Sequence, residues 1–574
     1  MYISEIKEIT NYRNLSNLKI SFDKTMNFFI GENNIGKTNI LELLNKIFSS
    51  CKFVETDFYD KSKPIRIVFT IKYDDKSIGF FEDNFDVDCN NSITLIAEQD
   101  DIEENISYYH DTSNKTLISN SIIKKINVLY YYAQRLPSKE IGFKQNYGTA
   151  KVLNYMIELG LNKFGVKEGD IIQSIKINNI IKEINNSFNK INAITGDSII
   201  TYMDSNVNEL ISRLLMIGDD KEHEFNLVGD GIQYAFNIIL QIIEVIYKVK
   251  RSKKPDRFNE RLICVEDKKY FPLIMLFDEP EIHQHSYRQR YLIKKIVSIL
   301  NNENNDFIKL LKYLFNIDGL SGQLFISTHS PNILLNDYKQ FIRIYRNSIK
   351  KELEVISGNN LNLDQDLYKH LLHNYIYLKE SMFSKIIIFV EGDTENGAMH
   401  VFAERKKIDL DQYGIGVVKL DGADSVLYYM ELYKKFEIKT YAIIDSDKKN
   451  KYNKYKDIYF TYGEDYEEDI YLNFNLKDYL KCCRELDMLE SMIKPIKNIE
   501  PNLDVEAFKD NVDILKINED DAKKLMDNCK MDQLSKLRKS KNAYKGAILA
   551  KYVTKIPEAY NKFINVIIKE VNCG

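Results

Sequence analysis

The sequence contains no tryptophan, and its seven cysteines are scattered without a Cys-x-x-Cys pair. Closely spaced cysteines usually signal a zinc site or a disulfide framework, so this distribution predicts reduced thiols and excludes a zinc ribbon. No uninterrupted apolar run approaches the ~20 residues of a membrane-spanning helix. The charged, alternating start, MYISEIKEITNYRN, does not have the pattern of a signal peptide. We therefore expect a cytoplasmic protein that does not bind a membrane.

Neither sign of charge dominates the chain. Lysine and arginine number 80 and aspartate and glutamate 84, for a formal net charge of −4. This balance excludes a uniformly basic nucleic-acid-binding protein but is compatible with a local basic channel. The apolar share of 44% and the charged share of 29% are ordinary for a soluble globular protein. A length of 574 residues is too great for one hydrophobic core and predicts roughly three to four domains.

A glycine-containing turn, GENNIGKT at residues 31–38, lies between an apolar run and an apolar helical pattern. A strand before and a helix after such a turn are the context of a phosphate-binding loop. The glycines let backbone N–H groups face a phosphate, and the helix N-terminus adds its positive dipole. Lys37 is predicted to reach the β- and γ-phosphates of ATP, and Thr38 to ligate Mg²⁺. The nucleotide-binding residues expected here are Gly31, Asn33, Asn34, Gly36, Lys37 and Thr38.

Three later segments fit the same nucleotide site. The apolar run at 273–277 ends in Asp278 and Glu279, which are expected to hold Mg²⁺ through water and to polarise the attacking water, respectively. The glycine pair in residues 229–233 precedes an apolar helix and forms a possible anion-binding nest. A third strand is followed by His329, a candidate sensor of the γ-phosphate, although a lone histidine at a strand end is more often structural.

In this order of motifs, residues 1 to about 345 resemble the ABC-type ATPases of the SMC and RecF kind. The resemblance implies that residues 229–233, with Gly231, correspond to the signature loop, residues 281–285 to the D-loop and His329 to the switch histidine. It also implies a dimer that encloses two ATP molecules, each signature loop facing the partner's phosphate loop. The usual signature serine is absent, and the acidic Asp230 would lie near the γ-phosphate. Slow hydrolysis is therefore expected.

Apolar residues repeat at spacings of three and four between about 150 and 215, for example over 177–191, which predicts helices. They fit either an ordinary packed helix or an inserted arm that carries dimer contacts. The expected domain order is an ATPase N-terminal part at 1–150, this helical insertion at 151–215, and an ATPase C-terminal part at 216–350. A linker helix at 351–383 and a second α/β domain with a helical C-terminal region at 384–574 follow.

Acidic side chains follow two predicted strands of the second domain. KIIIFV, residues 385–390, leads into Glu391 and Glu395, and TYAII, residues 440–444, leads into Asp445 and Asp447. The carboxyl ends of adjacent parallel strands meet at one sheet edge, where α/β proteins bind ligands. Carboxylates that lie so close repel one another unless a divalent metal neutralises them. Glu467 adds an acid at a predicted helix start. The alternative is that these acids cap separate helices.

The combination V-E-G-x-x-E followed by D-x-D on a strand resembles a TOPRIM domain, over residues 385 to about 471. This resemblance implies Mg²⁺ or Mn²⁺ and phosphodiester chemistry on DNA. The metal ligands that it implies are Glu391, Glu395, Asp445, Asp447 and Glu467.

An ABC-type ATPase followed directly by TOPRIM resembles, over essentially the whole chain, the OLD (overcoming lysogenization defect) family of nucleases, which includes Gabija and retron-associated relatives. The implied fold is α/β: an ABC/SMC-like P-loop ATPase domain with a helical insertion, then a Rossmann-like parallel sheet with helical elaboration. The implied function is a metal-dependent endonuclease or nickase for double-stranded DNA, regulated by ATP binding and active in antiphage defence. The implied partners are further copies of the chain and a helicase or other defence-system subunit encoded nearby.

In that family a lysine near the C-terminus assists the transition state. The basic stretch SKLRKSKNAYKGAILA, residues 535–550, supplies Lys545 as the first choice and Lys541 as the second. The alternative is that these lysines only contact the DNA backbone. Two rival functions also stay open for the whole chain: a non-cutting, DNA-bound ATPase of the RecF or SMC kind, and an RNA-cutting effector that acts with a partner.

Overall fold

The structure is a computed structural model. It describes residues 1–73, 91–111, 115–132, 140–143, 147–164, 182, 217, 224–252, 257–282, 284–335, 337–347, 350–365, 367–369, 379–420 and 422–573. The chain forms two compact units. The first comprises Met1–Phe29 and Gly36–Thr328, and the second comprises Ile30–Ile35 and His329–Gly574. The last part of the predicted ATPase, from 329 to 350, thus belongs to the second unit.

An antiparallel sheet in the first unit carries the N-terminal strands. Its order is β2-β1-β4-β5-β6-β7. The strands are β1 (Tyr2–Thr10), β2 (Ile20–Ser21), β4 (Ile65–Lys72), β5 (Ser92–Gln99), β6 (Ser107–His110) and β7 (Leu117–Ile118). The alternating patterns near the N-terminus and at 64–73 predicted β1, β2 and β4, whereas no pattern singled out β5, β6 or β7.

A parallel sheet in the same unit carries the nucleotide motifs. Its neighbours run in the order β3-β11-β10-β8, all parallel, and β9 pairs with β10 antiparallel. The strands are β3 (Met26–Ile30), β8 (Asn127–Tyr131), β9 (Ile263–Val265), β10 (Lys268–Asp278) and β11 (Gly319–Ser327). Every residue of β3 is buried, which explains its continuous apolar run. Because the strands are parallel, the phosphate loop, Asp278 and the end of β11 meet at one edge.

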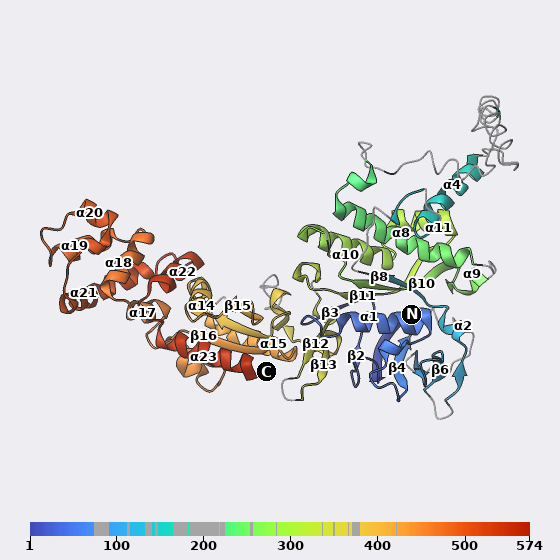
Figure 1. The fold of residues 1–574 in the computed structure, drawn as a ribbon, viewed down its shortest axis with the longest axis horizontal. Coiled ribbons are helices and arrows are strands. Elements are labelled where there is room, and N and C mark those ends of the chain that lie inside the picture. Colours follow the sequence, from blue (N-terminus) through green and yellow to red (C-terminus); the bar gives the residue numbers. More distant parts are fainter. Residues whose placement is uncertain are drawn as a thin grey trace, which may run out of the picture. The chain divides into compact units, whose positions relative to one another are not determined.

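Helices flank this sheet, with α8, α10 and α11 over one face and α1 on the other (Figure 1). The helices are α1 (Lys37–Asn45), α2 (Asn120–Ile123), α4 (Ala150–Phe164), α8 (Asp230–Lys250), α9 (Arg257–Glu260), α10 (Ser286–Leu300) and α11 (Asn305–Phe315). Within the predicted insertion at 151–215, the structure describes only α4 and residue 182. The repeat at 177–191 is almost wholly outside the described residues, so both interpretations of it stay open.

Helix α8 is the one described helix that is long and apolar enough, by composition, to cross a membrane. More than half of its apolar window, 56%, is buried inside the fold. It packs against β8, α4 and α11. These contacts are those of a core helix of the first unit, because its apolar face is covered by protein.

The second unit begins with the hairpin β12 (Phe341–Arg346) and β13 (Leu353–Ser357), so the start of the predicted linker helix at 351–383 is instead a strand. A parallel sheet follows, in the order β15-β14-β16-β17. Its strands are β14 (Ile386–Val390), β15 (Ile415–Lys419), β16 (Lys439–Ile444) and β17 (Ile458–Phe460). The helices between and after them are α14 (Asp393–Arg405), α15 (Val426–Lys435), α16 (Lys449–Tyr452) and α17 (Tyr466–Tyr471).

A helical region completes this unit. It comprises α18 (Leu476–Glu485), α19 (Glu490–Lys497), α20 (Val505–Asp510), α21 (Glu519–Leu537), α22 (Ala543–Tyr552) and α23 (Glu558–Cys573). One apolar core joins the sheet to these helices, with Ile388 of β14, Tyr466 of α17 and Leu549 of α22 among its members. The helical region is therefore part of the same folding unit as the sheet.

Two glycines allow α14 and α22 to cross with their backbones in close approach. A Cβ on Gly546 would lie 1.8 Å from the carbonyl oxygen of Thr394, and one on Gly397 would lie 1.9 Å from that of Ala543. Real Cβ atoms do not approach backbone oxygen so closely, so both positions require glycine. This crossing places the loop before α22 beside the N-terminus of α14.

Candidate functional site

Two strand ends of the second unit meet where the sequence predicts an acidic site. In the parallel pair β14 and β16, Val390 lies opposite Ile443. Glu391 follows β14 directly, and Asp445 follows β16. The backbone N–H of Asp445 donates a hydrogen bond of 3.0 Å to Oε2 of Glu391. The two acidic segments therefore share one edge of the sheet.

Two further carboxylates are almost fully enclosed at this edge. Glu395, in the first turn of α14, is 3% exposed, and Glu467, in the first turn of α17, is 0% exposed. Oε2 of Glu395 and Oε1 of Glu467 are buried and accept no hydrogen bond from the described residues. Buried carboxylate oxygens without partners are costly, and a bound cation would satisfy them. The residues present therefore fit a divalent metal.

The side chains are not already arranged as a closed coordination shell. Across the described ranges, no group of three or more His, Cys, Asp or Glu side chains has the geometry of a ready metal site. Binding a metal here would require rotation of carboxylate side chains around fixed strand and helix ends.

Burial and mutual repulsion alter the acidity of these groups. The pKa of Asp445 is raised to about 9, chiefly by burial and then by the neighbouring charges of Glu395 and Glu391, while Lys541 opposes the shift. The pKa of Glu395 is raised to about 7, chiefly by burial and then by Glu467, again against Lys541. Burial also raises the pKa of Glu467. Raised pKa values of this kind are typical of carboxylates that form a cation site. A bound cation would lower them, because it stabilises the ionised form.

Asp447 lies apart from this group. It is exposed, and its described ion pair is with Lys448, at 3.6 Å. The structure thus gathers four of the five predicted ligands, Glu391, Glu395, Asp445 and Glu467, and leaves Asp447 on the solvent side.

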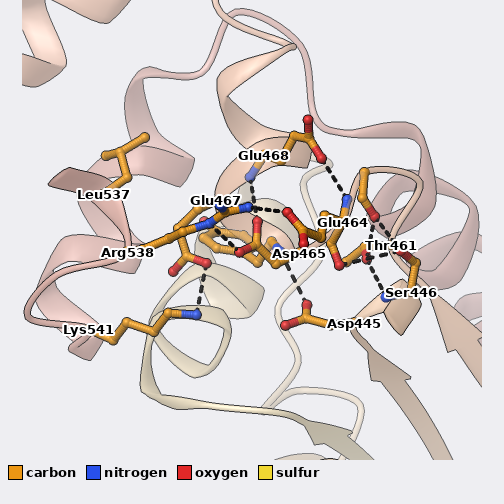
Figure 2. A network of polar contacts seen from close by, with 12 residues as sticks. Asp445, Ser446, Thr461, Glu464, Asp465, Glu467, Glu468, Leu537, Arg538 and Lys541 are labelled. Atoms are coloured by element: carbon orange, nitrogen blue, oxygen red, sulfur yellow. Dashed lines mark hydrogen bonds and ion pairs between the residues drawn. The ribbon is translucent and has the colours of Figure 1, made fainter. Parts of the chain in front are cut away.

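The two candidate lysines have different surroundings. Nζ of Lys541 lies 2.9 Å from Oε2 of Glu467, inside the acidic cluster (Figure 2). Lys545 is 7% exposed, and its Nζ donates to the carbonyl oxygens of Lys536, Leu537 and Lys539 at 3.0, 2.7 and 2.8 Å. The first two carbonyls belong to the last turn of α21, where helices leave oxygens unsatisfied, and the third lies just beyond it. The geometry favours Lys541 over Lys545 as the lysine of the site, the reverse of the sequence-based order.

A second network holds the helix that carries Glu467. Asp465 caps α17 by accepting a 2.9 Å hydrogen bond from the N–H of Glu468. The guanidinium of Arg538 donates to Asp465 at 2.7 Å and to Glu464 at 2.8 Å (Figure 2). Sequence analysis did not identify these residues. An aspartate before an acidic helix start is a recognisable capping signal, but the Arg538 contact depends on packing between segments distant in the chain.

The last residues of the phosphate loop, 36–38, and the acidic end of β10 come together in the first unit. Oγ1 of Thr38 donates a 3.1 Å hydrogen bond to Oδ1 of Asp278, and burial raises the pKa of that carboxyl. Gly36, with φ of +110°, precedes α1, and Lys37 is buried. Asn33 and Asn34 are exposed. Thr38 and Asp278 are therefore placed to share one Mg²⁺.

The remaining nucleotide candidates lie on neighbouring turns. Gly231 accepts a 2.8 Å hydrogen bond from the side-chain amide of Gln284, which joins the signature-like loop to the predicted D-loop. Asp230 is the first residue of α8 and is exposed. Glu279 follows β10 in a left-handed conformation, with φ of +48°. His329 is exposed directly after the buried Thr328. The structure shows no contact that tests the role of His329.

Two family models match this chain. One is the AAA ATPase domain, over residues 1–334, and the other is the overcoming lysogenization defect protein-like TOPRIM domain, over residues 382–447. The fold and the two family matches together show a protein in which a TOPRIM domain follows an ATPase domain. They also confirm the predicted α/β fold class. The chain belongs to the AAA ATPase domain family, and the domain that follows matches the OLD-like TOPRIM domain.

Individual relatives are more distant. The chain is 22% identical to Endonuclease GajA of Bacillus cereus over 437 residues, which are 69% of this chain and 58% of that protein. The chain thus spans less than two thirds of that relative's length. It is 57% identical over 42 residues to the DNA replication and repair protein RecF of Clostridium kluyveri, which are 7% of this chain and 11% of RecF.

Two solved structures are among those similar to this one. The SMC head bound to the C-winged helix domain of ScpA covers 64% of this chain and 99% of its own, with a TM-score of 0.35 and 14% identity. The C-terminal region of the Burkholderia pseudomallei OLD protein covers 33% of this chain and 99% of its own, with a TM-score of 0.20 and 18% identity.

Proposed function

We propose that this protein is a divalent-metal-dependent DNA endonuclease or nickase whose activity is regulated by ATP binding. The observation that carries the proposal is the cluster of Glu391, Glu395, Asp445 and Glu467, in which the buried Glu395 and Glu467 have carboxylate oxygens without hydrogen bonds. The match of residues 382–447 to the OLD-like TOPRIM domain and the similarity to Endonuclease GajA support the same activity. A cluster of this kind is hard to explain as structure alone, because apolar residues would fill the space at lower cost.

Each group of residues at the acidic cluster has a separate proposed role in DNA cleavage. The four carboxylates hold Mg²⁺ or Mn²⁺, and Asp447 is a further ligand available from the solvent side. The bound metal supplies charge neutralisation and Lewis acidity at a DNA phosphate. Lys541, held at the cluster by Glu467, offsets negative charge that develops on the phosphate during attack. Arg538 and Asp465 keep α17, and hence Glu467, in position.

Incubation with supercoiled plasmid tests the nuclease activity. The wild-type protein should nick or linearise the plasmid with Mg²⁺ or Mn²⁺ and not with EDTA, and Glu391→Ala should abolish cutting. Glu404→Ala, an exposed carboxylate on α14, is the matched control and should cut normally. Failure of the wild type to cut DNA at any nucleotide concentration, or equal cutting by Glu391→Ala, would refute the proposal. Cutting of RNA alone would favour the RNA-cutting effector. Hydrolysis of ATP in the presence of DNA, with no DNA cut, would favour the RecF-like ATPase.

The nucleotide site is the proposed regulator. ATP-Mg²⁺ binds the phosphate loop through Lys37 and Thr38, with Asp278 supporting the Mg²⁺ and Glu279 polarising the attacking water. His329 senses the γ-phosphate. The acidic Asp230 at the start of α8 disfavours a γ-phosphate nearby, so turnover is slow and ATP acts mainly by binding.

The proposed working form is a homodimer or higher homo-oligomer. The signature-like loop is exposed at Gly229 and Asp230, and apolar side chains around it are also exposed: Leu227 is 74%, Ile232 45% and Phe236 40% exposed. Large exposed apolar side chains near one loop favour a contact with another protein surface. The expected partner surface is the phosphate loop of a second copy.

The proposed biological role is antiphage defence in the cytoplasm, on double-stranded DNA. The resemblance to the OLD family supports this role, and a helicase or another defence subunit encoded nearby is a candidate partner. Expression in a bacterial host should lower the plating efficiency of susceptible phages, and Glu391→Ala should restore it. Inspection of the neighbouring genes would identify the partner.

A further inference from the structure

The connection between β16 and β17 is the most basic short stretch near the acidic cluster. Residues 448–456 read KKNKYNKYK, five lysines in nine positions, and follow Asp445 and Asp447 directly. The chain as a whole has a net charge of −4. A negatively charged protein that binds a polyanion needs such a local concentration of cations.

This stretch is anchored to the fold. Tyr452 is 1% exposed, and its hydroxyl donates a 3.4 Å hydrogen bond to Asp424. The same carboxylate pairs with Nζ of Lys451 at 2.7 Å. At its start, the hydroxyl of Ser446 donates a 2.7 Å hydrogen bond to the carbonyl oxygen of Gly463. The neighbouring lysines are therefore presented from a fixed backbone, which lowers the entropy cost of binding.

Three lysines of the stretch have no described counter-charge. Lys449, Lys454 and Lys456 are exposed and form no ion pair in the described part of the chain, whereas Lys448 and Lys451 each pair with an aspartate. Tyr455 is 36% exposed, and Nζ of Lys454 lies 5.2 Å from its ring centre. The surface of the stretch thus combines free positive charge with an exposed aromatic ring.

The position of the stretch matters for a phosphodiester that must enter the acidic cluster. Lys449, the first residue of α16, follows Asp445 by four residues. Lys456 lies two residues before Ile458, which is paired with Ala442 of β16. The stretch therefore begins at the carboxylate edge of the sheet and runs back along its flank.

On the other side of the cluster, the loop before α22 presents Lys541 together with the exposed Lys539 and the 62% exposed Tyr544. A phosphate approaching four carboxylates is repelled until a metal binds, and flanking cations reduce that repulsion.

We propose that Lys449, Lys454 and Lys456 bind phosphates of the DNA strand that leads away from the scissile bond, without reading its sequence. The inference rests on the proposed nuclease function and adds a substrate-docking element to it. Each strand of the duplex carries one phosphate per about 3.4 Å of helix axis, so a short basic stretch meets several of them.

The test uses the full-length chain with Glu391→Ala, which prevents cutting, and a fluorescent DNA duplex in titrations at several NaCl concentrations. Replacing Lys449, Lys454 and Lys456 with Gln should reduce the slope of log affinity against log salt by about 2 to 3, because each lost phosphate contact contributes about 0.9. The matched control replaces Lys494, Lys497 and Lys516, which are equally exposed and lie elsewhere in this unit. That control changes the net charge identically and should leave the slope unchanged.

A second measurement separates docking from chemistry. With Glu391 restored, the triple variant should need more DNA for half-maximal cutting but reach a single-turnover rate close to wild type at saturation. Equal salt slopes for the triple variant and the control would overturn the inference. If the wild-type protein still cuts DNA in that case, the proposed function stands. Wild-type protein that neither binds nor cuts DNA would instead overturn the proposed function, and the inference with it.

Discussion

At the scale of single residues, Lys541 and Lys545 show how neighbouring lysines acquire different roles. The Nζ of Lys545 donates to three carbonyl oxygens, two in the last turn of α21 and one just beyond it. Lys541 is half-exposed and faces a single buried carboxylate. The contacts of Lys545 are therefore those of a structural residue, whereas Lys541 keeps its charge at the acidic cluster, where the proposed function needs it.

Substituting each lysine with methionine should separate these roles. Lys541→Met should lower the single-turnover cutting rate by roughly 10²-fold or more, since it removes an electrostatic contact to the reacting phosphate, and should change stability little. Lys545→Met should lower the free energy of unfolding by about 2–3 kcal/mol, because buried carbonyls lose charged donors. Cutting rates and urea denaturation check both variants. A stable Lys545→Met protein that cannot cut would contradict this division.

Glu395 should make metal-free stability depend on pH. Its pKa is about 7 in the fold, against 4.5 for an ordinary glutamate, so the folded state holds a proton that the unfolded state releases. Its stabilising contribution is fully present below about pH 4.5 and declines as the pH rises through 7. Measured in EDTA, the melting temperature of wild type relative to Glu395→Gln should therefore fall across this window. Adding Mn²⁺ should reverse the decline. If the melting temperatures of wild type and Glu395→Gln change with pH in parallel without metal, the prediction is wrong.

At the scale of elements, the crossing of α14 and α22 positions the site. Gly546→Ala should lower the free energy of unfolding by about 2–3 kcal/mol, because the added methyl must displace backbone at Thr394. Gly160→Ala in α4 is the matched control, since nothing lies within 4 Å of that Cβ. A mid-helix glycine replaced there should be neutral or stabilising by up to about 1 kcal/mol. Thermal unfolding compares the two, and an unaffected Gly546→Ala protein would show that the helices can separate at no cost.

The same elements show what sequence could and could not predict. The turn 31–38 and the acidic ends of β14 and β16 were predictable, because each motif lies within a few consecutive residues next to a strand. The contact between Arg538 and Asp465, and the carbonyl partners of Lys545, arise where distant segments pack, and no local pattern encodes them. Lys545 was preferred because it starts an apolar helix, yet packing of α21 directs it away from the carboxylates. The hairpin strand β13 was missed because its short apolar run adjoins a helical pattern.

At the scale of the whole molecule, the phosphate loop contacts the element that leads to the acidic cluster. Glu32 of the loop forms a 3.1 Å ion pair with Lys385, which directly precedes β14. The far end of β14 leads to Glu391. Arg343, buried between the same segments, donates to the carbonyl oxygens of Phe436 and Glu437 at 3.0 and 3.1 Å. All of these residues lie in the second compact unit, so a nucleotide at the loop can bias β14 through direct contacts.

This connection predicts how nucleotide control can be removed without removing cutting. Lys37→Ala should retain metal-dependent cutting at a rate that no longer changes with ATP concentration, because the phosphate contact is lost. Lys385→Met should still bind ATP but show a weaker effect of ATP on the cutting rate. Since the Glu32 pair is half-exposed, it contributes at most about 1 kcal/mol, and the ATP effect should shrink by up to about fivefold.

Lys350→Met is the matched control for Lys385→Met, because Lys350 pairs with Glu354 at 3.1 Å on β13 of the same unit. It should keep the full ATP effect. Plasmid-cutting rates across an ATP titration, with binding measured separately, distinguish the variants. If Lys385→Met responds to ATP as wild type does while Lys37→Ala does not, the signal must pass through other contacts of the loop, of which the buried Arg343 is the next to test. If Lys37→Ala keeps its response to ATP, nucleotide control does not act through the phosphate loop at all.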